Sequence, residues 1–109
     1  MTITKIADGY AVSPQISHEE VERIAAAGFR SLVCNRPDSE DGAVPSAMIR
    51  QIAEARGLRF HYIPVEGNVS RDHVDQMARV LRRAPRPVLA YCRSGSRATE
   101  LFDTTRKVA

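Results

Sequence analysis

The sequence predicts a single α/β domain, a three-layer sandwich in which a mostly parallel central sheet is flanked by helices. Short apolar runs alternate along the chain with segments whose apolar residues recur at helical spacing. The apolar runs are continuous rather than alternating in polarity, as in strands buried on both faces of a parallel sheet. A chain of 109 residues suffices for one domain with its own core, so residues 1–109 are expected to form a single unit.

The first part of the chain predicts a hairpin, a helix and a buried strand. Residues 2–6 and 10–12 flank Asp8-Gly9, a pair that favours a tight turn between two short strands. A capping-box pattern begins at Ser17 and starts a helix, which Gly28 ends. Residues 29–34 form an apolar run, which indicates a strand inside the sheet.

The rest of the chain continues the alternation. A polar loop over residues 35–45 is long for so small a domain, which is typical of functional loops. A helix over 46–56, a strand over 59–65 and a helix from the N-cap Ser70 through Arg83 are expected next. Two prolines then break the chain, residues 88–91 form the central strand, and residues 97–108 form the last helix.

Three loops are expected to meet at one edge of the sheet, where the parallel strands end. They follow Cys34, Val65 and Tyr91, and right-handed crossovers place them side by side. This edge is the predicted active site. The residues expected there are Asn35, Arg36, Asp38, Glu66 and the loop that begins at Cys92.

The segment after the central strand has the composition of an anion-binding loop with a nucleophilic thiol. Cys92 stands between a strand and a helix, where backbone N–H groups and the helix dipole favour the thiolate. Gly95 allows an anion to approach the backbone closely, and Arg97 can bind its oxygen atoms with a planar guanidinium group. Cys92 is therefore the predicted nucleophile. The predicted anion-binding residues are Arg93, Ser94, Gly95, Ser96 and Arg97.

Composition limits the cofactors and partners that we expect. No cluster of His and Cys has metal-ligand spacing, so neither a metal nor another cofactor is expected. The net charge of +3 comes without a nucleic-acid motif, and no apolar stretch is long enough to cross a membrane. We expect no nucleic-acid partner, no membrane partner and, because the first residues lack a signal-peptide pattern, a cytoplasmic location. The oligomeric state is left open.

Two families resemble parts of the chain. Residues 87–98, with Cys92, four intervening residues and Arg97, resemble the active-site loop of the rhodanese sulfurtransferases. Most of the chain resembles the small bacterial phosphatase-like domain that occurs alone or fused to β-lactamase-like hydrolases. The matching segments are Val12-Ser13-Pro14-Gln15, Gly28-Phe29, Asn35-Arg36-Pro37-Asp38, Ile63-Pro64-Val65 and the Cys92 loop. This resemblance implies a fold like that of the tyrosine and dual-specificity phosphatases.

The chain departs from the tyrosine phosphatase pattern at the loop and at the acid. Those enzymes have a His before the Cys and five residues between Cys and Arg, whereas here Tyr91 precedes Cys92 and four residues intervene. A shorter loop encloses less space, which favours one added sulfur atom over a phosphoryl group. The phosphatase relatives carry an Asp after the strand that corresponds to residues 63–65, where this chain offers Glu66 or Asp72 as the acid.

The first functional expectation is a sulfurtransferase. Cys92 would attack the outer sulfur of a small sulfur-containing anion such as thiosulfate, or of a persulfide, and pass that sulfur on as a Cys92 persulfide. The alternative is a phosphatase with a phosphoester substrate, a phosphoryl group on Cys92, and Glu66 or Asp72 as acid. A second alternative is a non-catalytic module that senses an anion or a persulfide.

Three other residues near the predicted cleft receive roles. Cys34 ends a neighbouring strand and is expected either to pack in the core or to act as a resolving cysteine for Cys92. Arg36 and Asp38 are expected to pair with each other and to orient the cleft.

Overall fold

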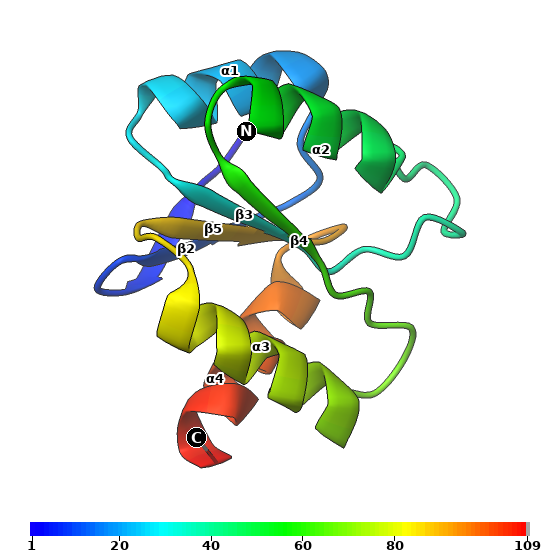
Figure 1. Cartoon of the computed structure of the whole chain (residues 1–109). Helices are drawn as coiled ribbons and strands as arrows, with labels where there is room; N and C mark the ends of the chain where they lie inside the picture. Colours follow the sequence, from blue (N-terminus) through cyan, green and yellow to red (C-terminus); the bar gives the residue numbers. More distant parts are fainter. Residues whose placement is uncertain (109) are drawn as a thin grey trace.

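The protein forms one five-stranded sheet with two helices on each face. The structure, a computed structural model, describes residues 1–108. Figure 1 shows α1 and α2 covering one face of the sheet and α3 and α4 covering the other. The elements are β1 (Thr4–Ala7), β2 (Tyr10–Ser13), α1 (His18–Ala26), β3 (Ser31–Cys34), α2 (Ser46–Ala55), β4 (Arg59–Tyr62), α3 (Arg71–Arg83), β5 (Val88–Tyr91) and α4 (Ser96–Val108).

The strand order places β5 at the centre of the sheet. The order is β1-β2-β5-β3-β4, with β1 antiparallel to β2 and every other neighbouring pair parallel. The predicted three-layer α/β fold is thereby confirmed. Because β5 lies between β2 and β3, the residue that follows it, Cys92, emerges between the ends of two other strands.

The predicted elements occur in the predicted order, with small shifts at their ends. The strand expected over residues 59–65 is paired only over β4, Arg59–Tyr62. Beyond it the chain still follows its neighbour, since the backbone N–H of Ile63 donates to Cys34 O at 2.9 Å and that of Val65 donates to Asn35 O at 3.0 Å. These two bonds extend the pairing between neighbouring segments beyond the end of β4, towards the Cys92 loop.

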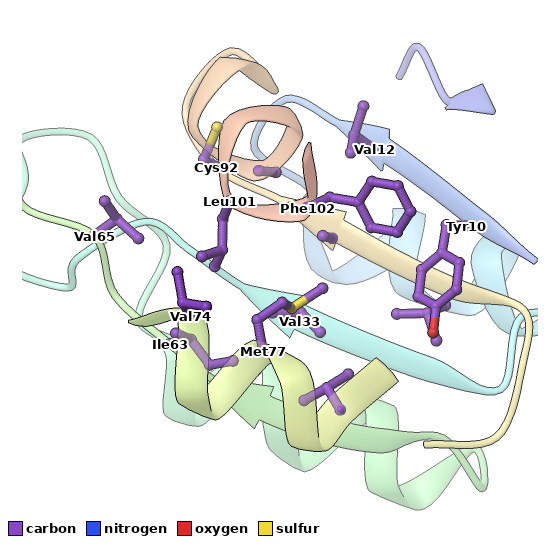
Figure 2. Packing of buried hydrophobic residues seen from close by; sticks show 14 residues of the cluster. Tyr10, Val12, Val33, Ile63, Val65, Val74, Met77, Cys92, Leu101 and Phe102 are labelled. Atoms are coloured by element: carbon purple, nitrogen blue, oxygen red, sulfur yellow. The ribbon is translucent and has the colours of Figure 1, made fainter. Parts of the chain in front are cut away.

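Two apolar clusters, one on each face of the sheet, form the core. Successive residues of a strand point to opposite faces, so neighbouring residues of one strand belong to different clusters. Val33 packs towards α3 and α4, whereas Cys34 packs towards α1 and α2. Cys92 belongs to the cluster on the α3–α4 face, where Figure 2 shows it close to Leu101 of α4.

Among the helices that the structure describes, none is both long enough and apolar enough to cross a membrane.

Candidate active site

Cys92 lies at the junction of the central strand and the last helix. It follows β5 directly, and α4 begins at Ser96. The backbone N–H of Gly95 donates a hydrogen bond to Cys92 Sγ at 3.0 Å. Figure 2 shows the sulfur directed towards the loop that enters α4. The thiol therefore faces the N-terminal end of α4.

Gly95 gives the loop its shape. Its φ of +97° lies in the region that residues with a side chain rarely adopt. The Gly95 carbonyl accepts from the Thr99 N–H at 3.0 Å and from the Thr99 hydroxyl at 2.9 Å, which fixes the first turn of α4. The backbone can thus turn its N–H inward to Cys92 while its carbonyl continues the helix.

The hydroxyl groups of Ser94 and Ser96 contact each other rather than Cys92. The backbone N–H of Ser96 donates to Ser94 Oγ at 3.3 Å, and the two hydroxyl oxygens are 3.0 Å apart. The side chains of Arg93, Ser94 and Ser96 are exposed, whereas Cys92 is fully buried at 0% exposure. Within the described residues, Gly95 supplies the one backbone N–H that bonds Cys92 Sγ.

Arg97 reaches from α4 to the loop that follows β3. Its Nη1 and Nη2 donate to the two carboxylate oxygens of Glu40, with Nη2 to Oε1 at 2.9 Å. Nη1 also donates to Val65 O at 2.9 Å. Hydrogen bonds to Glu40 are the main reason why the pKa of Arg97 lies above its ordinary value, and the neighbouring Cys92 adds to this. Arg97 is therefore held between two loops and next to the thiol.

The contacts of Arg97 leave one edge of its guanidinium group for a ligand. Arginine has one N–H at Nε and two at each Nη. Glu40 and Val65 take both donors of Nη1 and one of Nη2. The Nε donor and the second Nη2 donor share one edge, and this pair matches two oxygen atoms of a planar or tetrahedral anion.

Arg36 also donates a hydrogen bond to the Glu40 carboxylate that binds Arg97. Its Nε donates to Glu40 Oε1 at 3.0 Å, its Nη1 to Gln15 Oε1 at 3.1 Å, and its Nη2 to Asp41 O at 2.7 Å. Arg36 is 6% exposed. The hydrogen bonds and charges of Arg97 and Arg36 keep the pKa of Glu40 below its ordinary value, although partial burial opposes this. Glu40 is thus an ionised bridge between two arginines.

The expected pairing of Arg36 with Asp38 is wrong. Asp38 accepts from Ser46, the first residue of α2, through the backbone N–H to Oδ1 at 2.7 Å and through the hydroxyl to Oδ2 at 2.8 Å. Its own N–H donates to the Tyr62 hydroxyl at 2.8 Å. A carboxylate next to the free N–H groups that begin a helix is stabilised there, and this satisfies Asp38 without an arginine.

Asn35 ties together the strand ends beneath the predicted cleft. It is fully buried, its backbone N–H donates to Tyr91 O at 2.8 Å, and its Nδ2 donates to Ile63 O at 2.9 Å. Asn35 therefore connects β3 with the end of β5 and with the segment after β4. Its position is structural, directly below the loop that carries Arg36 and Glu40.

The two candidate acids lie on the surface beyond β4. Glu66 is exposed and follows Val65, whose carbonyl oxygen binds Arg97. Asp72 is exposed in the first turn of α3. Chain connectivity thus places Glu66 one residue from a direct contact of Arg97, and Asp72 farther along.

Cys34 and Tyr91 point away from Cys92. Both belong to the apolar cluster on the α1–α2 face, whereas Cys92 belongs to the cluster on the opposite face. Burial raises the pKa of the Cys34 thiol, and it raises that of Tyr91 as well. The Cys34 thiol donates to Arg36 O at 3.4 Å, and both cysteines are free. With the sheet between them, the geometry gives no support to Cys34 as a resolving cysteine.

Over residues 1–108, no group of three or more His, Cys, Asp and Glu side chains is arranged to hold a metal ion.

The family of the chain follows from comparison with known proteins. The model of the family described as "Beta-lactamase hydrolase-like protein, phosphatase-like domain" matches residues 2–109. The chain belongs to this family. A curated member, the beta-lactamase hydrolase-like protein of Xylella fastidiosa (strain Temecula1), is 32% identical over 104 residues, which are 94% of this chain and 24% of that protein. The chain thus spans about a quarter of the length of the curated relatives it matches.

Solved structures show the same fold. A phosphatase candidate from Neisseria meningitidis is 35% identical, superposes with a TM-score of 0.86, and is matched over 97% of this chain and 77% of its own. The core catalytic domain of the PP-IP phosphatase SIW14 from S. cerevisiae superposes with a TM-score of 0.67 over 96% of this chain and 74% of its own. At 16% identity, the second likeness concerns the fold alone.

These comparisons correct the first functional expectation. A sulfurtransferase was inferred from the short spacing between Cys92 and Arg97, but the family and the 35% identical structure are phosphatase-like. The loop spacing is a local feature, whereas the family match covers residues 2–109. The domain is phosphatase-like, and the phosphatase alternative agrees better with these findings.

The sequence alone did not reveal Glu40. It lies in a polar loop with other acidic residues, and its partner Arg97 is 57 residues away. Gln15, which accepts a hydrogen bond from Arg36, was also given no role. It was noted only as part of a segment that resembles the phosphatase-like family. Charged residues in neighbouring loops could have suggested an ion pair, but not which carboxylate makes it.

Proposed function

We propose that this domain hydrolyses phosphate monoesters through a phosphoryl group carried on Cys92. The observation that supports this most directly is the position of Arg97. Glu40 and Val65 hold it beside the thiol, and its Nε–Nη2 edge remains for two phosphate oxygens. The family and the 35% identical phosphatase candidate support the same reaction class.

In the first step, the Cys92 thiolate attacks phosphorus and an S–P bond forms while the bond to the ester oxygen breaks. The Gly95 N–H and the start of α4 face the anionic group, and Arg97 binds the equatorial oxygens as their charge increases. Because Cys92 is fully buried, we expect residues 93–96 to move apart when the phosphoryl group binds. Water then attacks phosphorus, and the thiolate leaves.

The departing ester oxygen needs a proton, and we assign the donor to Glu66. Glu66 lies next to Val65, which binds Arg97, and its side chain is exposed. Glu40 is unsuited to this role, because the two arginines lower its pKa and both of its oxygens accept hydrogen bonds. Asp72, the other acid that the sequence offers for this role, serves as the comparison.

Hydrolysis of p-nitrophenyl phosphate between about pH 5 and 8 tests the proposal, since carboxylic acids and thiolates commonly coexist in that range. We expect turnover by the unaltered protein, none by Cys92→Ser, and turnover by Cys34→Ala. Cys34 is the matched control because it is the other buried cysteine and lies on the opposite face of the sheet. Equal turnover by Cys92→Ser would contradict the proposal.

A comparison of leaving groups tests the acid. Replacing a proton donor slows esters of weakly acidic alcohols more than esters of p-nitrophenol, whose anion leaves without protonation. Glu66→Gln is expected to lower kcat for phenyl phosphate about 10- to 100-fold more than kcat for p-nitrophenyl phosphate. Asp72→Asn is expected to leave this ratio unchanged, and the reverse result would assign the acid to Asp72.

A further inference from the structure

A second concave site lies along the outer edge of the sheet, away from Cys92. It is a groove of about 490 Å³ between β4, α2 and α3, lined by no residue of the Cys92 loop. In Figure 1, β4 lies with α2 on one side and α3 on the other. Four arginines line the groove: Arg50, Arg59, Arg79 and Arg83.

These four arginines give the groove an uncompensated positive charge. None of them forms an ion pair within the described part of the chain, and no carboxylate is among the lining residues. The guanidinium carbon of Arg50 stands 5.2 Å from the centre of the Phe60 ring, so this cation is held over the strand. A ligand with several negative charges would complement this arrangement.

The backbone of β4 offers hydrogen-bonding groups on the same side. β4 is the last strand of the sheet. The N–H of Arg59 donates to Arg30 O at 3.0 Å and that of Ile63 donates to Cys34 O at 2.9 Å, so alternate residues face β3. The N–H and C=O groups of Phe60 and Tyr62 therefore point to the open edge, where a further strand can pair with them.

His61 adds an unsatisfied polar atom to the groove. Its Nε2 is buried and has no hydrogen-bond partner among the described residues, although the side chain lines the groove. Burial, with the charges of Arg59 and Arg50, lowers the pKa of His61. A neutral ring can donate to or accept from a ligand, and buried polar atoms usually have such a partner.

We propose that this groove binds an acidic peptide segment that lies extended along β4 and adds a strand to the sheet. The peptide backbone pairs with Phe60 and Tyr62, and alternate acidic side chains, which share one face of the added strand, reach Arg79 and Arg83 of α3. A peptide fits better than a nucleic acid. Phosphate groups only accept hydrogen bonds, whereas the open edge presents both N–H and C=O groups. This interaction goes beyond the proposed catalysis at Cys92.

Binding of a fluorescent peptide tests the proposal without any enzymatic turnover. The probe is a peptide of about eight residues with alternating glutamate and threonine, a length typical of strands. We expect saturable binding in low salt that weakens as salt is added. In a labelled protein, the amide signals of Phe60 and Tyr62 are expected to shift on titration.

Two controls distinguish binding of the peptide in this groove from general attraction between opposite charges. Arg79→Glu is expected to weaken binding about fivefold or more, whereas Arg82→Glu is expected to change it much less. Both residues are exposed on α3, but Arg82 lies outside the groove. A peptide methylated at alternate backbone nitrogens is expected to bind about tenfold more weakly, because it cannot pair with the strand.

The proposal would be overturned by absence of saturable binding, by an equal loss with Arg79→Glu and Arg82→Glu, or by unchanged affinity of the methylated peptide. Tight binding of an RNA oligonucleotide or of polyphosphate without binding of the peptide would also reject a peptide site. Circular dichroism of each variant confirms that the fold is retained.

Discussion

At the scale of single residues, the site depends on a carboxylate that makes no direct contact with the thiol. Glu40 accepts hydrogen bonds from both Arg97 and Arg36, and so connects Arg97 to the loop after β3. We propose that its role is to position Arg97. This role separates orientation, which Glu40 provides, from proton transfer, which we assign to Glu66.

Replacement of Glu40 tests this positioning role. Glu40→Gln is expected to lower kcat/KM for an aryl phosphate about 10- to 100-fold, because Arg97 loses the orientation that aims its free edge at the anion. We also expect inorganic phosphate to inhibit this variant less strongly. Asp41→Asn is the matched control, since Asp41 is the adjacent acid and only its backbone oxygen contacts Arg36. Equal losses in both variants would show that the loop charge, rather than the Glu40–Arg97 pair, matters.

The lowered pKa of Glu40 predicts how the stability of the protein depends on pH. The pKa of Glu40 is lower in the folded protein than its ordinary value of 4.5. Its contribution to stability is therefore fully present above that value and is lost as the pH falls through the lowered pKa. Thermal melts of the unaltered protein and Glu40→Gln are expected to differ most at neutral pH and to converge as the pH falls through the lowered pKa of Glu40. A difference that grows on acidification would contradict this account.

At the scale of elements, the loop between β5 and α4 has its shape because of Gly95. The positive φ and the inward N–H belong to the same residue, so one substitution affects both the strain and the contact with Cys92. A Cβ at this position would lie 3.6 Å from the backbone of Ser13, an ordinary contact. Strain in the backbone, rather than a clash, is therefore the expected consequence of a side chain.

Gly28 provides a matched control for Gly95. Gly28 has a φ of +98°, and a Cβ there would meet nothing within 4 Å. Gly95→Ala and Gly28→Ala are each expected to cost about 1–2 kcal/mol in the free energy of unfolding, because both force an alanine into the left-handed region. Only Gly95→Ala is expected to abolish phosphate ester hydrolysis. Full activity of Gly95→Ala would show that the loop shape is unimportant.

Local signals in the sequence predicted the helices and strands better than they predicted the contacts between loops. The Ser17 and Ser70 caps form as expected, and the apolar runs become the strands. The Cys92 loop was predictable because its residues are adjacent in the chain. The Arg36–Asp38 pairing was wrong because short spacing suggested it, whereas Asp38 is satisfied by the start of α2. Glu40 was missed because its partner is distant in sequence.

At the scale of the whole molecule, the sheet separates two apolar clusters, and the cluster on the α3–α4 face supports the site. Leu101 of α4 is fully buried in the cluster that contains Cys92. Figure 2 shows Leu101 close to Cys92. Packing in this layer therefore sets the position of α4, and with it the positions of Gly95 and Arg97.

Truncation of Leu101 tests this support. Leu101→Ala is expected to reduce the free energy of unfolding by about 2–5 kcal/mol, because it leaves a cavity in a fully buried cluster. Val108→Ala is the control on the same helix, since Val108 is 67% exposed and should change stability by less than about 0.5 kcal/mol. Urea unfolding measures both. Similar values for the two variants would mean that α4 is not held by this packing.

We propose that Cys92 carries the phosphoryl group during turnover. The test is to mix the protein with an aryl phosphate, quench it rapidly in denaturant at neutral to alkaline pH, where an S–P bond survives, and analyse its peptides by mass spectrometry. We expect the mass of one phosphoryl group on the peptide that contains Cys92, and none on that peptide in Cys92→Ser. Steady turnover without label on this peptide, or with label on another residue, would contradict the account.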